Sequence, residues 1–258
     1  MTDRGERRPL IAARSRACPT MPGFTQGVAC IPTVLVVWSS AAFILSYVVA
    51  VFSGHVEALF PYISDTGAKP PESGIFGFMI NISAFLGAIT MYTKYLILEE
   101  QNRETHFVSP CFNLLTLCVG IVGCIGMGIV ASFQELAVPA VHDGGALLAF
   151  VSGALYIVLQ TVICWKSLPQ WSTLCIFYTR LVLSIMTALT VIPMIACASQ
   201  ISITKIEWNP GEKDYLYHLV SAVCEWTVAF GFVFYFLTFI KEFQGVTIRI
   251  TAELHENF

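Results

Sequence analysis

Six long apolar stretches, separated by short polar segments, constrain the fold of this chain more than any other feature. A membrane-spanning helix needs about 20 consecutive apolar residues, whereas a barrel strand needs only about 10 of alternating polarity. Composition agrees, because 12% of the 258 residues are charged, against about 25% in soluble domains. We therefore expect an all-α polytopic membrane protein, a six-transmembrane-helix bundle with spans at about 31–52, 73–92, 112–133, 144–165, 174–198 and 217–240.

The polar segments set the domain organisation and the orientation. Residues 1–26 carry five arginines and no apolar run, which predicts a disordered basic tail, and Met21 is an alternative start that would make this tail dispensable. Residues 241–258 form a short tail. Six spans place both ends on one side, which carries 11 Lys and Arg against three on the other. Both termini are therefore expected to be cytosolic. The formal charge of −3 indicates no nucleic-acid surface.

Glu225 lies inside the last span, where a carboxylate is costly in lipid and should face other helices or a watery cavity. Helical spacing places it on a small and polar stripe, and the opposite face, free to meet lipid, includes Trp226. The stripe consists of His218, Ser221, Ala222, Glu225 and Ala229. Partners for this stripe must come from elsewhere in the chain.

Several polar residues are expected in the same half of the membrane as Glu225. The segment 61–67, rich in proline, glycine and short polar side chains, predicts an ordered turn. The candidate functional polar cluster consists of Asp65, Asn81, His142, Asp143, His218 and Glu225, with Glu135 nearby. Asn81 and His142 are the partners considered for Glu225.

Three interpretations of this cluster remain open. Histidine and carboxylate side chains are zinc ligands, which would suit a metal-dependent hydrolase, although no HExxH motif supports it. Alternatively, Glu225 and His218 titrate in a proton-linked or lipid-binding cavity. In the third interpretation Glu225 is a hydrogen-bonded anchor for the last span. We expect no catalytic residue, cofactor or bound metal, because phosphate-binding, nucleophile-elbow and CxxC motifs are also missing.

Other residues predict packing and span ends. Gly120, Cys124 and Gly128 in the third span should pack against Gly145, Ala149 and Gly153 in the fourth. A charged loop is expected at 94–110. Arg180, in the fifth span, is expected to extend toward the membrane interface.

Several motifs in order resemble the DNA damage-regulated autophagy modulator family, and its first-described, lysosomal member in particular. They are WSSAAF (38–43), PYISDTG (61–67), GIFG (74–77), GIVASFQ (128–134), WNP (208–210) and EW (225–226). The resemblance covers residue 27 to the end.

This resemblance implies a six-span lysosomal membrane protein, induced through the p53 response, that promotes autophagy and contributes to cell death. It implies no catalytic residues. The implied partners are the lipid bilayer and proteins of autophagy or lysosomal trafficking. Wider relatives are linked to lipid remodelling, which keeps a luminal-face lipid hydrolase or a proton-linked transporter as alternatives.

Overall fold

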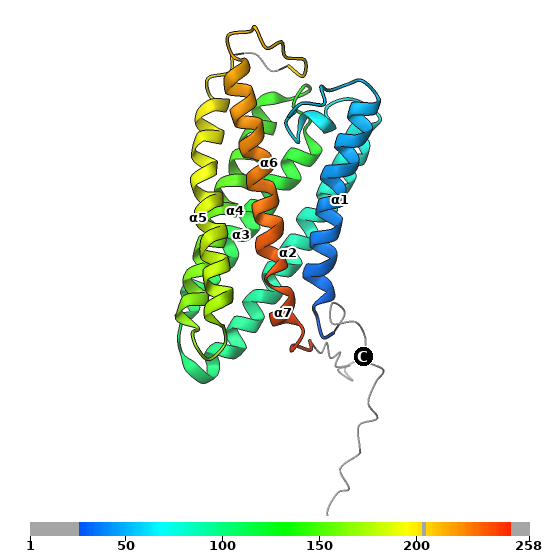
Figure 1. Ribbon diagram of the computed structural model, residues 1–258. Helices are drawn as coiled ribbons and strands as arrows, with labels where there is room; N and C mark the ends of the chain where they lie inside the picture. Colours follow the sequence, from blue (N-terminus) through cyan, green and yellow to red (C-terminus); the bar gives the residue numbers. More distant parts are fainter. Residues whose placement is uncertain (1–25, 203–204, 249–258) are drawn as a thin grey trace, which may run out of the picture.

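The computed structural model describes residues 26–202 and 205–248. Figure 1 shows a single bundle of long helices that run side by side. Apart from Gln26, the predicted disordered tail lies outside the described residues, as do the last ten residues of the predicted C-terminal tail.

Six of the described helices are long and apolar enough to cross a membrane, which confirms the predicted fold class. They are α1 (Cys30–Phe52), α2 (Glu72–Thr105), α3 (Pro110–Ser132), α4 (Pro139–Lys166), α5 (Leu174–Ala198) and α6 (Tyr215–Leu237). Two short elements accompany them. The 3-10 helix η2 (Asp65–Gly67) precedes α2, and α7 (Ile240–Phe243) follows α6.

The long helices form a closed ring. Each packs against its neighbours in chain order, and α6 completes the ring by packing against α1. Residues 26–29 and 240–248 meet at one end, here called the terminal end, where the Val28 amide donates to the carbonyl oxygens of Phe243 and Val246 at 3.2 and 3.1 Å. The opposite end, here called the loop end, holds the connections 53–71, 133–138 and 199–214 (Figure 1).

Local sequence explains where several helices begin. Ser109 and Thr173 precede α3 and α5, and their side-chain oxygens accept the backbone N–H groups of Phe112 and Ile176, both at 3.3 Å. Such caps satisfy amides that have no partner inside the helix. Pro110 follows its cap at the first helical position, where proline removes no helical hydrogen bond.

Helix α2 is longer than the sequence predicted. The expected charged loop at 94–110 is wrong, because α2 continues to Thr105 and ends at His106, whose φ of 50° is left-handed. Residues 95–105 are rich in leucine, glutamate, glutamine and arginine, which favour helix. The change to charged residues marks the end of the apolar stretch, but the helical backbone hydrogen bonds of α2 continue beyond that point.

Glycines let α3 and α4 approach closely, as predicted. A Cβ added to Gly126 would lie 2.6 Å from the backbone nitrogen of Ala149 and 2.7 Å from the carbonyl oxygen of Gly145. The face of α3 is not the predicted one, because helix rotation cannot be read from spacing alone. The predicted face, which carries Gly120, Cys124 and Gly128, meets residues of α2, and at Gly120 it also meets Tyr156 of α4.

A buried ion cluster holds the terminal end together. Arg180 donates from Nη1 to Glu242 Oε1 at 2.8 Å and from Nε to Thr238 Oγ1 at 2.9 Å, and Lys94 pairs with the other oxygen of Glu242. Arg180 is 1% exposed, so the expectation that it extends to the interface is wrong. Residues 241–243, expected to begin a free tail, belong to α7, where Phe243 is fully buried.

Candidate functional site

Residues 61–67, here called the cover loop, fold over the loop-end half of α6. The backbone N–H of Ile63 donates to Glu225 Oε2 at 2.9 Å, and Glu225 is 7% exposed. The indole N–H of Trp226 donates to the Pro61 carbonyl at 2.8 Å. The polar stripe of α6 is buried as predicted. Trp226, expected on the lipid side, instead anchors the cover loop.

The cover loop is ordered by its own short polar side chains. Asp65 Oδ2 accepts the backbone N–H of Tyr62 at 3.1 Å, and the Thr66 hydroxyl donates to the Ile63 carbonyl at 2.6 Å. Such local bonds are the reason that aspartate and threonine favour turns. The ordered turn predicted from the sequence is therefore present, and it presents its Ile63 amide to α6.

Three carboxyl groups lie near one another at the loop end, one in the cover loop itself and two from other segments. Glu135, from the α3–α4 connection, accepts the Ser64 hydroxyl at 2.9 Å, while Asp65 is 2% exposed. Burial, followed by the charges of Glu135 and Glu225, raises the pKa of Asp65 well above its usual value of 3.8. We call Asp65, Glu135 and Glu225 the acid cluster.

His218 lies about two turns before Glu225 on α6, between two aromatic rings. The Trp208 ring stacks on it with centroids 4.6 Å apart and an interplanar angle of 14°, and the Tyr62 ring meets it edge-on at 4.7 Å. These contacts join the connection 199–214 to the cover loop. His218 Nδ1 is buried without a hydrogen-bond partner among the described residues.

The other predicted polar residues occupy different positions. His142, in the first turn of α4, donates from Nδ1 to the Phe133 carbonyl at 2.8 Å, and its neighbour Asp143 is exposed. Asn81 is also exposed, and its amide donates to Gly77 O at 2.9 Å and Ser132 Oγ at 3.3 Å. It therefore joins α2 to α3. The partner of Glu225 is a backbone amide, and neither Asn81 nor His142 takes that place.

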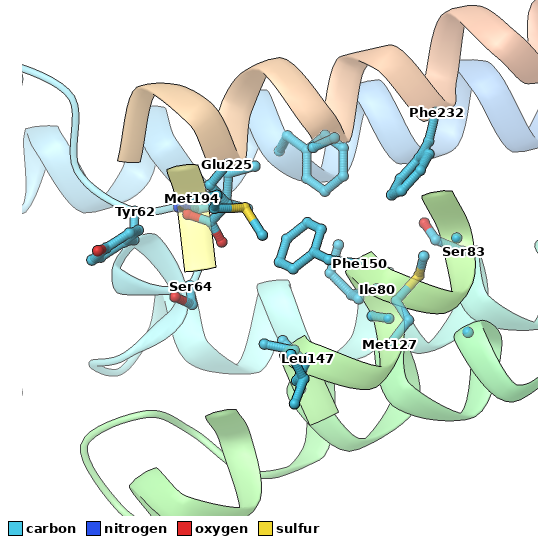
Figure 2. A pocket seen from close by; sticks show the side chains of 18 of the residues that line it. Tyr62, Ser64, Ile80, Ser83, Met127, Leu147, Phe150, Met194, Glu225 and Phe232 are labelled. Carbon is cyan, nitrogen blue, oxygen red and sulfur yellow. Dashed lines mark hydrogen bonds between the residues drawn. The ribbon is translucent and has the colours of Figure 1, made fainter. Parts of the chain in front are cut away.

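A cavity of about 460 Å³ occupies the centre of the ring, with residues of all six long helices in its wall. Figure 2 shows Tyr62, Ser64 and Glu225 at one end of this cavity, and apolar side chains together with Ser83 at the other. The wall includes the exposed residues Asp143 and Ser199, so the cavity reaches the surface at the loop end. Its apolar part is lined by residues such as Ile80, Met127, Phe150 and Phe232.

Sequence reasoning raised a cavity beside Glu225 and His218 as one interpretation, but it did not predict the extent of the cavity or most of its wall. Tyr62 and Ser64 line it from the cover loop, and Trp208 and Lys205 from the connection 199–214. The available signal was the turn motif at 61–67, which predicts an ordered loop but not what the loop covers. Within the part of the chain that the structure describes, no three His, Cys, Asp or Glu side chains are grouped to hold a metal ion.

The fold and site together define a six-helix integral membrane protein with a central cavity, acidic at the loop end and apolar within. Residues 27–246, the cover loop and all six long helices included, match the family described as Frag1/DRAM/Sfk1/Cwh43P N-terminal domain. The chain belongs to this family.

Its relatives carry a more specific name. The chain is 66% identical to mouse DNA damage-regulated autophagy modulator protein 1 over 91% of its length and 99% of the relative's. It is 66% identical to the human protein of that name, over 90% and 98%, and 38% identical to rat DNA damage-regulated autophagy modulator protein 2, over 90% of both chains. No solved structure was found to match.

Proposed function

We propose that this chain is a multi-pass protein of the lysosomal membrane that promotes autophagy, and through it cell death, downstream of the p53 stress response. The observation that carries the proposal is 66% identity, over at least 90% of both chains, to relatives named as autophagy modulators. Those names also connect the role to DNA damage. The lysosomal location and the p53 response come from the resemblance of the sequence motifs.

The role proposed is that of a regulator and not of an enzyme. Two carboxyl side chains at the loop end hold the cover loop, since Glu225 binds the Ile63 amide and Glu135 binds the Ser64 hydroxyl. Bonds of this kind fix the cover loop on the bundle. Autophagy would then be promoted through binding, with lysosomal or autophagy proteins and membrane lipid as partners.

The terminal end is proposed to face the cytosol and the loop end the lumen. Among the described residues, the terminal half holds Lys94, Arg103, Lys166, Arg180 and Lys241, whereas the loop end holds Lys69, Lys205 and Lys213. An excess of basic residues favours the cytosolic side. Epitope tags after residue 258 and within 209–213 test this orientation, because only the former should be accessible when the plasma membrane alone is permeabilised.

The functional test is autophagic turnover in cells that lack the protein, measured with and without a block of lysosomal degradation. Wild type should restore turnover, and its localisation should coincide with lysosomal markers. The informative variant is Glu225→Gln at matched lysosomal abundance, because glutamine keeps an acceptor for the Ile63 amide and cannot ionise. Full rescue by this variant would show that Glu225 acts as an anchor.

Failure of Glu225→Gln at normal abundance and location would show that the ionised carboxylate takes part in function. Failure of wild type to change turnover would overturn the proposed role itself. Thr227→Leu is a matched control, because Thr227 lies on the same helix, is exposed, and bonds only to the Val223 carbonyl of its own helix.

A further inference from the structure

The cavity has the shape and lining of a ligand site within the membrane domain. Its volume of about 460 Å³ lies in the range of about 300–1,000 Å³ found for small-molecule sites, which are mostly apolar with a few polar groups. Here the polar groups are gathered at the loop end, while Phe150, Met127 and Phe232 surround the remainder (Figure 2). One polar end and an apolar interior match an amphipathic molecule with a single chain.

The charge at the loop end selects the kind of headgroup. Glu135, Asp143 and Glu225 line the cavity there, and Lys205 is the one Lys or Arg in the described wall. Lys205 is already paired with Glu212, and its Nζ lies 4.3 Å from the centre of the Trp208 ring. His142, also in the wall, donates to the Phe133 carbonyl. Carboxyl groups therefore outnumber basic groups in this part of the wall, and their oxygens can accept hydrogen bonds from a cationic group.

Glu225 offers that group a free acceptor. Only 7% of Glu225 is exposed. One of its carboxyl oxygens accepts the Ile63 amide. The other oxygen has no hydrogen bond to the described residues, and Figure 2 shows the carboxylate directed from α6 toward Ser64 and Phe150. Asp65 lies in the cover loop, where its Oδ2 accepts the Tyr62 amide, and it is not part of the cavity wall.

We propose that the cavity binds a long-chain amine, with its ammonium group between Glu135 and Glu225 beneath the cover loop and its single apolar chain along Phe150 and Met127. An ammonium provides three donors, which suits the free Glu225 oxygen and the Ser64 hydroxyl. The alkyl chain of the amine would move from bulk lipid into a cavity lined by apolar side chains. This inference concerns binding alone and does not depend on the role in autophagy.

The test is photolabelling of the purified full-length protein in phosphatidylcholine nanodiscs. Three reagents share one chain with a diazirine and an alkyne and differ only in the headgroup: hexadecylamine, hexadecanol and hexadecanoic acid. We expect the amine to label the protein at least about fivefold more strongly than the other two, a difference of about 1 kcal/mol in binding. Untagged hexadecylamine should compete with the label.

Two variants locate the site. Glu135→Gln with Glu225→Gln preserves both acceptors for Ser64 and Ile63 and removes the charge, so the preference for the amine should disappear. Ser83→Leu adds bulk at the apolar end, where Ser83 is labelled in Figure 2, and should reduce labelling with all three reagents. Thr227→Leu, which adds similar bulk on the exposed side of α6, should leave labelling unchanged.

The outcomes distinguish the proposal from its competitors. Equal labelling by the three headgroups would mean adventitious partition into apolar surface, and stronger labelling by the acid would indicate an anionic lipid site; either overturns the proposal. So does an unchanged amine preference in the double variant. Variants are compared only when they elute as wild type does in size-exclusion chromatography. If the double variant does not, the peptide cross-linked in wild type decides, because labelling outside the cavity wall contradicts the site.

Discussion

The backbone amide of Ile63 and the carboxylate of Glu225 are 162 positions apart in the chain and joined by a hydrogen bond of 2.9 Å between buried groups. A carboxyl acceptor inside α6 thus fixes a loop that follows α1. The bond connects the α1–α2 connection to α6 at the loop end of the bundle, where the cavity opens.

Replacing Glu225 should show how much this bond stabilises the fold. Glu225→Ala leaves the buried Ile63 N–H without an acceptor, which costs about 1–3 kcal/mol, whereas Glu225→Gln retains an oxygen. Thermal unfolding in detergent should therefore give a clearly lower midpoint for alanine than for glutamine. Equal midpoints for the two variants would show that the amide finds another partner.

The ion cluster predicts an unequal response to its members. Glu242 is shared by Lys94 and Arg180, so Glu242→Leu leaves two buried cations without a carboxylate, and breaking a buried pair costs about 3–5 kcal/mol. Lys94→Met leaves Arg180 paired with Glu242 and should cost less. The yield of monodisperse protein and its unfolding midpoint show which of the two variants is destabilised more. A larger loss for Lys94→Met would contradict this assignment of charges.

Stability should fall as the pH rises, because of Asp65. Its pKa is raised in the folded protein, so the folded state holds the proton more tightly than the unfolded state does. The stabilisation is complete below the usual value of 3.8 and is lost as the pH rises toward the folded pKa. The unfolding midpoint should be higher at about pH 5 than at about pH 7.5. Asp65→Asn should reduce that difference, and an unchanged difference would assign it to other groups.

The α3–α4 contact should tolerate no added side chain. Gly126→Val would place atoms within 2.6 Å of the Ala149 backbone, and overpacking of this kind costs about 1–3 kcal/mol. Gly144→Val is the matched control, since a Cβ there meets nothing within 4 Å. Circular dichroism during heating should show early unfolding for the first variant alone.

The sequence predicts best what depends on one helix at a time. Six spans and the buried stripe of α6 follow from hydropathy and helical periodicity, and both are observed. Asn81 shows the limit: depth along a span can be estimated from sequence, but the direction in which a side chain points depends on neighbours that are distant in the chain. The same limit hid the pairing of Arg180 with Glu242, 62 residues later, because each looked like a charge at the edge of the membrane.

The closed ring has a consequence for how the protein is made. Since α6 completes the ring by packing against α1, the cavity has no complete wall until the last span has entered the membrane. Before that step the Ile63 amide lacks its acceptor Glu225, and Arg180 lacks its counter-ion Glu242. A chain that ends before residue 215 would hold five of the six long helices and would lack both α6 groups, Glu225 and Trp226, that bind the cover loop.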